Sequence, residues 1–492
     1  MEDGWPEQAF ELHRRAGEVL AGSGNKVGVM DMLMIPKRLY GRDSEIASLL
    51  RLFEWIGRGH GGVLLVPGYS GVGKTTLVKW LRIPVQERDG FFIQGKFDQY
   101  QQSIPYSGVR DALSDLCGQL QSGNEEQRRR SQVDILDAVG NLGQLLLELV
   151  PEFETLLGQQ HSLADITPQE ARHRFAGLFQ NFLKAVCRPE HPVVLFIDDW
   201  QWADAASFEL LRRLEIGTLL RYLLVIVSYR DNEVDPSHPL FSMVEDLRGV
   251  GVPVEVLPVR NLKVNDVRLF LSDTLKPAAA NIEGLATVIY GRTGGNPFFV
   301  RSILTLLLGM NMIGFNFSRN MWDWQLESIS GAELPGNLVE LFLHKLRSLD
   351  RESRNLFSLA ACLGNRFDLE TLGIVSGRTE VECHTLLFSD QAKGLLLPPG
   401  VSGADPEDSG ICRFLHDSVQ QAAYTLIEPA ELPSLLLRIG RLMVARLQPE
   451  QPAERLFEVV RNLNAGAALV EDVFEQIKIL ELNVTAARKA YI

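Results

Sequence analysis

The sequence predicts an α/β fold in which a parallel sheet flanked by helices is followed by a largely helical C-terminal half. Short apolar strands alternate with helical segments up to about residue 260, which is typical of a parallel sheet covered on both faces. Beyond that point the strand signals fade and helical periodicity takes over. The chain has 492 residues, enough for about three domains.

Composition and charge narrow the class of protein. The net charge of −13 argues against nucleic-acid binding by the whole chain, because such binding needs a basic face. The 5 cysteines are scattered without a C-x-x-C pair, so we expect buried thiols in a reducing compartment and neither disulfides nor zinc. The N-terminus lacks an apolar signal segment, and no apolar stretch reaches the roughly 20 residues that span a bilayer. We therefore expect a cytoplasmic protein with no membrane partner.

The elements are expected in a regular order. Apolar residues at helical spacing after Asp43 predict a first helix with an acidic N-terminus. A second helix is expected from Lys74 to about Leu81, and residues 105–183 are largely helical in period. The predicted strands are GGVLLVPG, GFFIQG, PVVLFIDD, RYLLVIVSYRD and VPVEVLPV. Together these segments account for a parallel sheet with helices on both faces.

A glycine-rich motif follows the first predicted strand and opens a helix. The segment GYSGVGKTT fits the phosphate-binding pattern G-x-x-x-x-G-K-[ST]. Its glycines let backbone N–H groups point at an anion, and the helix N-terminus adds its dipole. We expect Lys74 to reach the phosphates of ATP or ADP and Thr75 to ligate Mg²⁺. The nucleotide-binding residues predicted from the motif are Gly68, Tyr69, Ser70, Gly71, Val72, Gly73, Lys74, Thr75 and Thr76.

The third predicted strand ends in two aspartates. Asp198 and Asp199 follow a buried apolar run, where a carboxylate pair is costly unless a cation compensates it. We expect Asp198 to hold Mg²⁺ through water and Asp199 to orient or deprotonate the water that attacks the nucleotide. Arg230 ends the next strand, at the sheet edge where ligands of such folds bind, and is expected to sense the γ-phosphate. A solvated Asp-Asp turn and a surface arginine capping a strand are the open alternatives.

Several longer segments carry a family resemblance. LYGRDSEIASLL, VPGYSGVGKTTLV, FFIQGKFDQYQQSIPYS, VLFIDDWQWADAAS, LLVIVSYRDNEV, GGNPFFV and FLHDSVQQAAY occur in this order. Together they resemble the AAA-type ATPase module of large multi-domain signalling kinases, which belongs to the STAND class of signal-transduction ATPases. Those proteins join a serine/threonine-kinase-like domain, this module, a sensor domain and a histidine kinase. The resemblance covers roughly residues 31–492 and implies a P-loop NTPase fold.

The resemblance implies roles for further residues. Gly41 and Arg42 are expected near the adenine, and Pro297 is expected to pack against the base from a helical lid. His416 matches the histidine of a Met-His-Asp motif, with leucine in place of methionine, and is expected to contact the β-phosphate of ADP from a winged helix. Asp417 is expected to cap the following helix. A satisfied core histidine beside a helix cap is the open alternative for His416.

The chain is expected to divide into five parts. These are an N-terminal arm over residues 1–38, an AAA/STAND P-loop ATPase domain over 39–260, a helical lid over 261–330, a winged-helix domain over 331–428 and the start of a TPR-like helical region over 429–492. The winged helix is predicted from two short strands around the turn-rich stretch PPGVSGADPEDSG. The last part holds one copy of a TPR-like pattern, which does not establish a repeat.

These observations predict an ATP-binding, Mg²⁺-dependent switch that regulates a partner kinase or other effector, in cis or in trans. Hydrolysis is expected to be slow, because the second acid is Asp199 rather than the glutamate of many AAA enzymes. The chain has no H-R-D or D-F-G triplet, so we expect no protein kinase activity from it. Self-association of the chain stays open.

Two other functions stay open at this point. An origin-recognition or transcription-type AAA ATPase would bind DNA through its winged helix. The predicted wing loop carries Asp405, Glu407 and Asp408 and no basic residue, so nucleic acid is not the expected partner. A non-catalytic scaffold would bind nucleotide without turning it over, and ATP hydrolysis that is lost in an Asp199→Asn variant would exclude it.

Overall fold

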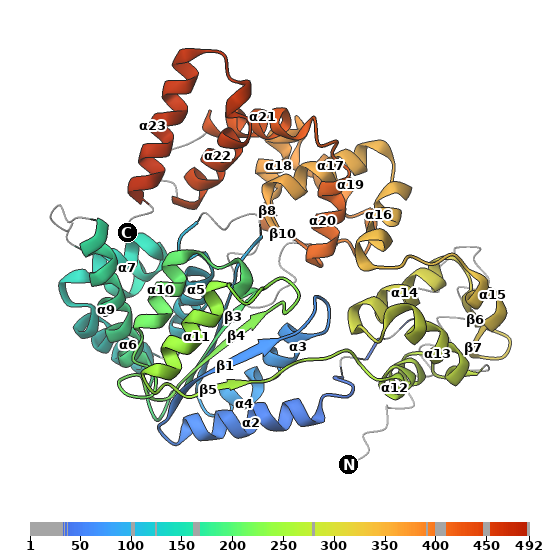
Figure 1. The fold of residues 1–492 in the computed structure, drawn as a ribbon, viewed down its shortest axis with the longest axis horizontal. Helices are drawn as coiled ribbons and strands as arrows, with labels where there is room; N and C mark the ends of the chain where they lie inside the picture. Colours follow the sequence, from blue (N-terminus) through green and yellow to red (C-terminus); the bar gives the residue numbers. More distant parts are fainter. Residues whose placement is uncertain are drawn as a thin grey trace. The chain divides into compact units, whose positions relative to one another are not determined.

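A five-stranded parallel sheet organises the first half of the chain in a computed structural model (Figure 1). The strands are β1 (Gly61–Pro67), β2 (Phe91–Lys96), β3 (Val193–Asp198), β4 (Leu223–Tyr229) and β5 (Val254–Val256). Their order across the sheet is β2-β3-β4-β1-β5, and each neighbouring pair is parallel. The predicted α/β fold with a parallel sheet is confirmed, and each predicted strand segment forms one of these strands.

The structure describes most of the chain and places it in two compact units. Described are residues 33, 35–36, 38–99, 104–123, 125–160, 168–277, 281–389, 392–398, 410–445 and 453–489. One unit holds the described residues up to Asp43 together with residues 71–73 and 260–337, and the other holds the remaining described residues. Most of the predicted N-terminal arm and the acidic residues of the predicted wing loop lie outside the described residues. The limits assigned to the domains stay predictions.

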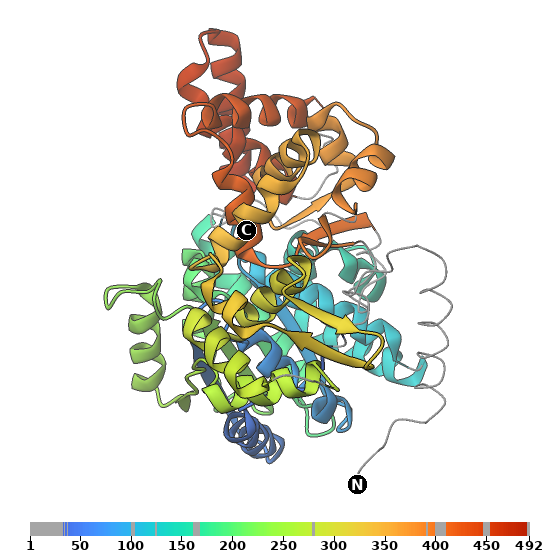
Figure 2. The ribbon, with the colours of Figure 1, turned by 90° about the vertical axis from the view of Figure 1, so that its right-hand side faces the viewer.

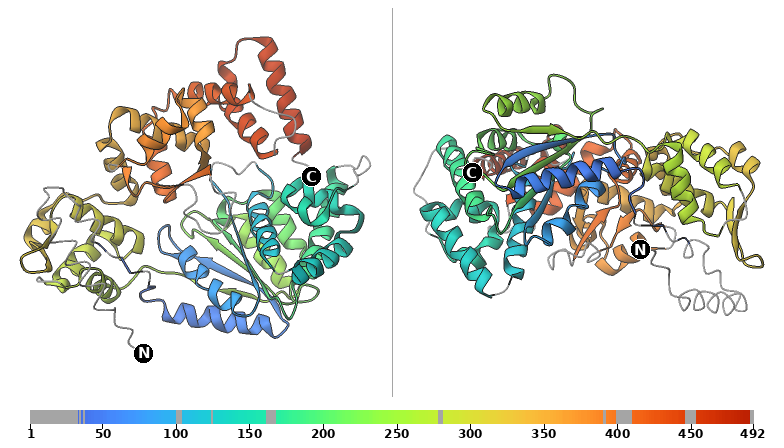
Figure 3. Two further views of the ribbon diagram at one scale, coloured as in Figure 1. Left: turned by 180° about the vertical axis from the view of Figure 1, so that it is seen from behind. Right: turned by 90° about the horizontal axis from the view of Figure 1, so that it is seen from below.

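Helices cover both faces of the sheet. On one face, Leu65 and Val225 join a large buried cluster with residues of α5 and α9, such as Leu116 and Phe182. The intervening strand residues point to the opposite face, because side chains alternate along a strand. The helices of this region are α2 (Asp43–Gly57), α3 (Lys74–Lys79), α4 (Arg82–Gln86), α5 (Ser107–Ser122), α6 (Glu125–Val139), α7 (Gly143–Leu149), α8 (Glu154–Leu157), α9 (Pro168–Val186), α10 (Ala205–Arg213) and α11 (Pro239–Gly249). Figure 1 shows α2 on one side of the sheet and α5 and α9 on the other, and the rear view in Figure 3 shows the same layers.

The helix after the glycine-rich motif is shorter than predicted. A single helix was expected from Lys74 to about Leu81, but α3 ends at Lys79 and α4 begins at Arg82. Pro84 explains the break, because a proline has no N–H to donate to the carbonyl group of residue 80 and its ring crowds the preceding turn. The motif is therefore followed by a short helix, and α4 starts separately.

Gly95 in β2 marks a close approach between the sheet and α5. A Cβ atom at this position would lie 1.7 Å from the carbonyl oxygen of Gly108 in α5. We expect Gly95→Ala to lower the free energy of unfolding by about 3 kcal/mol, because the clash forces backbone shifts. Urea denaturation measures the change.

Gly177→Ala is the matched control for this substitution. Gly177 lies in α9, and a Cβ atom there would meet nothing within 4 Å. Alanine at this position should raise the free energy of unfolding by up to about 1 kcal/mol, because glycine loses more backbone entropy in a helix. Equal stability of the two variants would contradict the packing explanation for Gly95.

The unit that contains residues 260–337 is helical but includes a hairpin that the sequence did not predict. Its helices are α12 (Val264–Thr274), α13 (Ile282–Thr293), α14 (Pro297–Gly309) and α15 (Leu326–Gly331), and its strands are β6 (Ile313–Asn316) and β7 (Met321–Trp324). The two strands pair antiparallel, and they appear as the yellow arrows in Figure 2. Ile313, Trp322 and Trp324 are buried at alternating positions. This period of two is too short to stand out beside the apolar helix before it.

The region after residue 337 combines helices with a small antiparallel sheet, which confirms the predicted winged-helix arrangement. The sheet contains β8 (Arg366–Asp368), β9 (Leu396–Leu397) and β10 (Ile411–Phe414) in the order β8-β10-β9. The helices are α16 (Leu338–Ser348), α17 (Arg351–Leu363), α18 (Leu369–Ser376), α19 (Glu380–Leu387), α20 (Asp417–Thr425), α21 (Leu432–Val444), α22 (Ala453–Ala465) and α23 (Val473–Lys489). Among the described helices of the chain, none has the length and apolar character that crossing a bilayer requires.

Candidate functional site

The glycine-rich motif lies at the carboxyl end of β1, as predicted. The ammonium group of Lys74 donates hydrogen bonds to the carbonyl oxygens of Gly68 at 2.7 Å and Tyr69 at 3.1 Å. Burial of Lys74 lowers the pKa of its ammonium group. The backbone N–H of Gly68 donates to the carbonyl oxygen of Tyr229, which anchors the start of the motif to β4. Tyr69 is exposed, and so is Thr76.

The apex of the motif, residues 71–73, depends on glycine. Gly71 and Gly73 have φ angles of 75° and 95°, which L side chains rarely adopt. Within the same compact unit, the guanidinium of Arg42 donates to the carbonyl oxygen of Val72 at 3.0 Å. The backbone N–H of Phe298 donates to the carbonyl oxygen of Gly71. Arg42 and the start of α14 therefore hold this apex from outside.

Gly41 and Pro297, both predicted near the base, occupy constrained positions in this unit. Gly41 has a φ of 60°, and a Cβ atom there would lie 2.6 Å from the carboxylate of Asp266. Pro297 is the first residue of α14, where its missing N–H costs nothing. Asn296 caps this helix by accepting a hydrogen bond from the backbone N–H of Phe299. These contacts explain why glycine occupies position 41 and proline position 297. That Gly41, Arg42 and Pro297 lie near the adenine base stays a prediction.

The two predicted metal ligands come together in the other unit. The hydroxyl of Thr75 donates to Oδ2 of Asp198 at 2.5 Å, across 123 residues of sequence. Oδ1 of Asp198 accepts hydrogen bonds from the hydroxyl of Ser228 and from the backbone N–H of Asp199. Asp198 is therefore fixed in orientation, with Thr75 beside it. Hydroxyl and carboxylate oxygens are the donors that Mg²⁺ prefers, so this pair fits a magnesium ion completed by water and phosphate oxygens.

Asp199 is buried in a cluster of charged and polar side chains. Its Oδ2 lies 3.0 Å from the ammonium of Lys96, and its Oδ1 lies 3.3 Å from Nε of Arg230. The side-chain amide of Gln201 also donates to Oδ1, at 2.9 Å. Burial disfavours the charge of Asp199, but Lys96 and Arg230 outweigh it and lower the pKa of this carboxyl group below its usual range. Asp199 and Arg230, which were each predicted as site residues, are thus in direct contact.

Asp417 connects this cluster to the winged-helix region. Its Oδ1 lies 2.9 Å from the ammonium of Lys96, and its Oδ2 accepts a hydrogen bond from Arg230 at 2.5 Å. Asn365 donates a further hydrogen bond to Oδ1 at 2.7 Å. Burial by itself opposes the charges of Lys96 and Arg230, yet the two aspartates raise the pKa of both cations. Lys96 and Arg230 therefore each bridge Asp199 in the sheet and Asp417 in α20.

His416, and not Asp417, caps α20. Nδ1 of His416 accepts a hydrogen bond from the backbone N–H of Ser418 at 3.0 Å. The prediction that Asp417 caps this helix is therefore wrong, because its carboxylate is engaged by Lys96 and Arg230 instead. Burial lowers the pKa of His416 to about 4, so the ring is neutral at pH 7 and carries its proton on Nε2. Contact of His416 with a nucleotide phosphate stays a prediction.

The half-buried His416 predicts a pH dependence of stability. The unfolded chain binds a proton at this histidine near pH 6.5, whereas the folded chain does so only near pH 4. Stability contributed by the neutral ring is therefore complete above pH 6.5 and is lost as the pH falls through this window. Between pH 7 and pH 5 the free energy of unfolding should fall by about 2 kcal/mol from this group.

His416→Asn tests this origin, because asparagine is a good helix cap that does not titrate. Urea denaturation of the variant at the two pH values should show a fall smaller by about 2 kcal/mol than in the wild type. An unchanged pH dependence would assign the loss of stability to other groups.

Lys96, Gln201 and Ser228 belong to the cluster but were not predicted as site residues. Lys96 ends β2 and Ser228 lies one residue before the end of β4. The signal that identified Asp198 and Arg230, a polar side chain at the carboxyl edge of a parallel sheet, therefore applies to them as well. Lys96 also falls in the segment FFIQGKFDQYQQSIPYS, which carries part of the family resemblance.

Comparisons with known proteins agree with the fold and the motif. Residues 38–226 match the family model described as an AAA ATPase domain. The hybrid signal transduction histidine kinase G of Dictyostelium discoideum is 25% identical across 94% of this chain, a match that covers 16% of that protein. The peroxide stress-activated histidine kinase mak3 of Schizosaccharomyces pombe is 21% identical across 63% of this chain and 15% of its own length. The chain spans about a sixth of the length of these curated relatives.

Solved structures with a similar arrangement include a STAND protein with a tetratricopeptide repeat sensor from Pyrococcus horikoshii. It is 14% identical with a TM-score of 0.47, over 92% of this chain and 51% of that chain. The ORC2 protein of Aeropyrum pernix is 14% identical with a TM-score of 0.35, over 85% of this chain and 98% of that chain. Residues 38–226 are therefore similar to AAA ATPase domains, and over most of its length the chain is similar to a hybrid signal transduction histidine kinase.

Proposed function

We propose that the chain is a nucleotide-dependent switch that binds ATP with Mg²⁺ and hydrolyses it slowly. The observation that carries this proposal is the double bridge in which Lys96 and Arg230 each contact Asp199 and Asp417. Asp199 stands at the carboxyl edge of the sheet, next to the magnesium-type pair Thr75 and Asp198. Asp417 begins α20 in the winged-helix region. A change at the nucleotide can therefore alter the attachment of the winged-helix region, and the reverse also holds.

Each residue has a distinct task in the proposed reaction. Lys74 and the backbone N–H groups of the motif hold the phosphates. Bound Mg²⁺ would compensate the negative charge of the phosphates. Asp199 orients a water molecule whose oxygen attacks the γ-phosphorus and whose proton passes to the carboxylate. The bond from the γ-phosphorus to the bridging oxygen breaks, and ADP and phosphate leave. Arg230 compensates the charge of the transferred phosphoryl group.

The same contacts explain why hydrolysis is expected to be slow. Both oxygens of Asp199 are engaged by the cations Lys96 and Arg230, and these cations lower the pKa of the carboxyl group. A carboxylate with a lowered pKa is a weak base, and its contacts leave it poorly placed to hold water. Separation of Asp417 from this cluster would change the pairing of Lys96 and Arg230 and so change how Asp199 is held. The winged-helix region thereby controls turnover, and it passes the state of the nucleotide to a kinase or other effector.

Asp199→Asn tests the hydrolytic part of this proposal. Asparagine keeps the size of the side chain but accepts no proton, so ATP hydrolysis should fall by about 100-fold or more. Nucleotide binding should persist, because Lys74 and the glycine-rich motif are unchanged. Phosphate release measured under saturating ATP and Mg²⁺ gives the rate, and equilibrium dialysis with labelled ADP gives the binding.

Asp204→Asn is the control for general effects of removing an acid near the end of β3. Asp204 caps α10 by accepting a hydrogen bond from the backbone N–H of Ser207, and it is not part of the Asp199 cluster. Hydrolysis that is equally slow in both variants would argue against a specific role of Asp199. No hydrolysis by the wild type under these conditions would leave nucleotide binding without turnover, as in a scaffold.

A further inference from the structure

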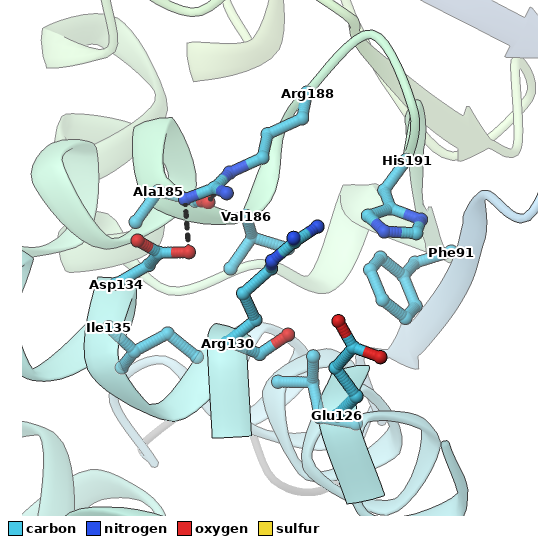
Figure 4. A pocket seen from close by; sticks show the side chains of 11 residues that line it. Phe91, Glu126, Arg130, Asp134, Ile135, Ala185, Val186, Arg188 and His191 are labelled. Atoms are coloured by element: carbon cyan, nitrogen blue, oxygen red, sulfur yellow. Dashed lines mark hydrogen bonds and ion pairs between the residues drawn. The ribbon is translucent and has the colours of Figure 1, made fainter. Parts of the chain in front are cut away.

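A pocket of about 310 Å³ lies far from the proposed nucleotide site (Figure 4). Its wall includes Phe91, the first residue of β2, and His191, which precedes β3. Asp198 and Lys96 end these two strands at the opposite, carboxyl edge of the sheet. A strand of six residues spans roughly 20 Å, so the pocket and the Asp199 cluster face opposite edges of the sheet. The pocket volume is near the lower end of the range of small-molecule sites, about 300–1,000 Å³.

A turn and a side-chain hydrogen bond fix His191 at one side of the pocket. The backbone groups of Arg188 and His191 exchange two hydrogen bonds, of 3.2 Å and 3.1 Å. Nδ1 of His191 donates to the carbonyl oxygen of Asp89 at 2.6 Å, which fixes the orientation of the imidazole ring. The ring of Phe91 lies 5.6 Å from it, centroid to centroid, at an angle of 42°. The two rings, tilted against each other, lie together at one side of the pocket.

Arg188 has a partner, whereas Arg130 has none among the described residues. Nη2 of Arg188 lies 2.6 Å from Oδ2 of Asp134, and its Nε donates to the carbonyl oxygen of Ala185 at 2.8 Å. Arg130 forms neither an ion pair nor a hydrogen bond with any residue that the structure describes. Figure 4 shows its side chain running from α6 into the space between Val186 and His191. A guanidinium in this position can receive an anion with two parallel hydrogen bonds.

Glu126 supplies a hydrogen-bond acceptor, whereas Arg130 supplies donors. It lies one helical turn before Arg130 on α6, and no ion pair joins the two side chains. Among the described residues it has no partner, and in Figure 4 it lies beside Phe91. A carboxylate beside an aromatic surface is a suitable acceptor for sugar hydroxyl groups, as in dinucleotide-binding folds. Leu120, Ile135 and Val186 complete an apolar floor.

We propose that this pocket binds a nucleoside monophosphate. The base would lie on the rings of Phe91 and His191, the phosphate would pair with Arg130, and a ribose hydroxyl would donate to Glu126. This class of ligand uses the two rings, the exposed Arg130 cation and the exposed Glu126 acceptor together. The site is separate from the proposed ATP switch and does not depend on it. Both sites include residues on or next to β2 and β3, so a ligand in the pocket could also influence the nucleotide site.

Calorimetric titration of the full chain with adenosine 5′-monophosphate tests the proposal. Prior saturation of the protein with ADP and Mg²⁺ occupies the glycine-rich motif, so heat from the monophosphate reports on a second site. Arg130→Gln should weaken binding by tenfold or more, because a charge-assisted pair is lost. Arg129→Gln is the matched control, because Arg129 is a neighbouring exposed residue of α6 that does not line the pocket. Its affinity should stay within about twofold of the wild type.

Two simpler probes separate the contributions of the ring and the anion. Inorganic phosphate and adenosine should each bind at least tenfold more weakly than the monophosphate, because each lacks one of the two recognised groups. Equal affinity of inorganic phosphate would mean that the ring surface is not used and would overturn the proposal. Absence of binding in the wild type up to millimolar concentration, or equal affinity in Arg130→Gln, would overturn it as well.

Discussion

Replacement of Lys74 by alanine is expected to weaken the binding of ATP and ADP by about 100-fold. The ammonium group of Lys74 now donates to the carbonyl oxygens of Gly68 and Tyr69 inside the motif, which positions it at the phosphate-binding loop. Hydrogen bonds from a charged group to phosphate contribute about 1.5–3 kcal/mol each, and the variant loses this contribution. Titration with a fluorescent ADP analogue measures the dissociation constant of each protein.

Lys79→Ala is the matched control for this experiment. Lys79 lies in the same helix, α3, but outside the glycine-rich motif, and burial lowers the pKa of its ammonium group as it does for Lys74. The control variant should bind nucleotide within about threefold of the wild type. If both alanine variants lose binding to the same extent, the loss reflects damage to α3. If neither loses binding, nucleotide does not use this motif.

Asp417→Asn is expected to accelerate the release of ADP by about tenfold or more. The substitution removes the carboxylate that Lys96 and Arg230 share with Asp199, and it leaves the half-buried Lys96 and the buried Arg230 with one fewer anion. Loss of one member of a buried ion pair typically costs about 3–5 kcal/mol. Only the part of this cost that differs between the bound and free states appears in the release rate. Stopped-flow displacement of a fluorescent ADP analogue measures that rate.

Glu233→Gln separates the bridge to α20 from a general effect on Arg230. Oε1 of Glu233 lies 2.8 Å from Nη1 of Arg230, so this carboxylate also pairs with the arginine. It follows β4 and makes no bridge to α20, so its amide variant should release ADP at nearly the wild-type rate. Equal acceleration in both variants would place the effect in Arg230 itself. An unchanged rate in Asp417→Asn would contradict a coupling through this bridge.

The neutral His416 and the charged Asp417 have different consequences for the proposed switch. His416 is committed to the helix cap through Nδ1, so its substitution acts on the N-terminus of α20 as well as on any phosphate contact. Asp417 makes no cap and contacts the cluster directly. A variant of Asp417 therefore tests the coupling more cleanly than His416→Ala does.

Local patterns made the sheet and the phosphate-binding motif predictable. The strands are short apolar runs buried on both faces, and the motif has a fixed spacing between a strand and a helix. Patterns of this kind depend on residues close in sequence, and β1 and α3 therefore lie near their predicted positions. The hairpin β6–β7 was missed because its alternating pattern is short beside the apolar helix that precedes it. The break before α4 was missed because it depends on a single proline, Pro84.

The sequence by itself determined which side chains stand at the carboxyl edge of the sheet, because each of Asp198, Asp199 and Arg230 ends or follows a recognisable strand. Only the tertiary structure decided their partners. Lys96 and Asp417 are 321 residues apart, yet their side chains lie 2.9 Å from each other. No local pattern specifies such a pair, because it arises when the winged-helix region packs beside the sheet and the two aspartates Asp199 and Asp417 share two cations. The sequence likewise predicted Asp417 as the cap of α20. In the folded protein His416 caps this helix, because Lys96 and Arg230 engage the carboxylate of Asp417.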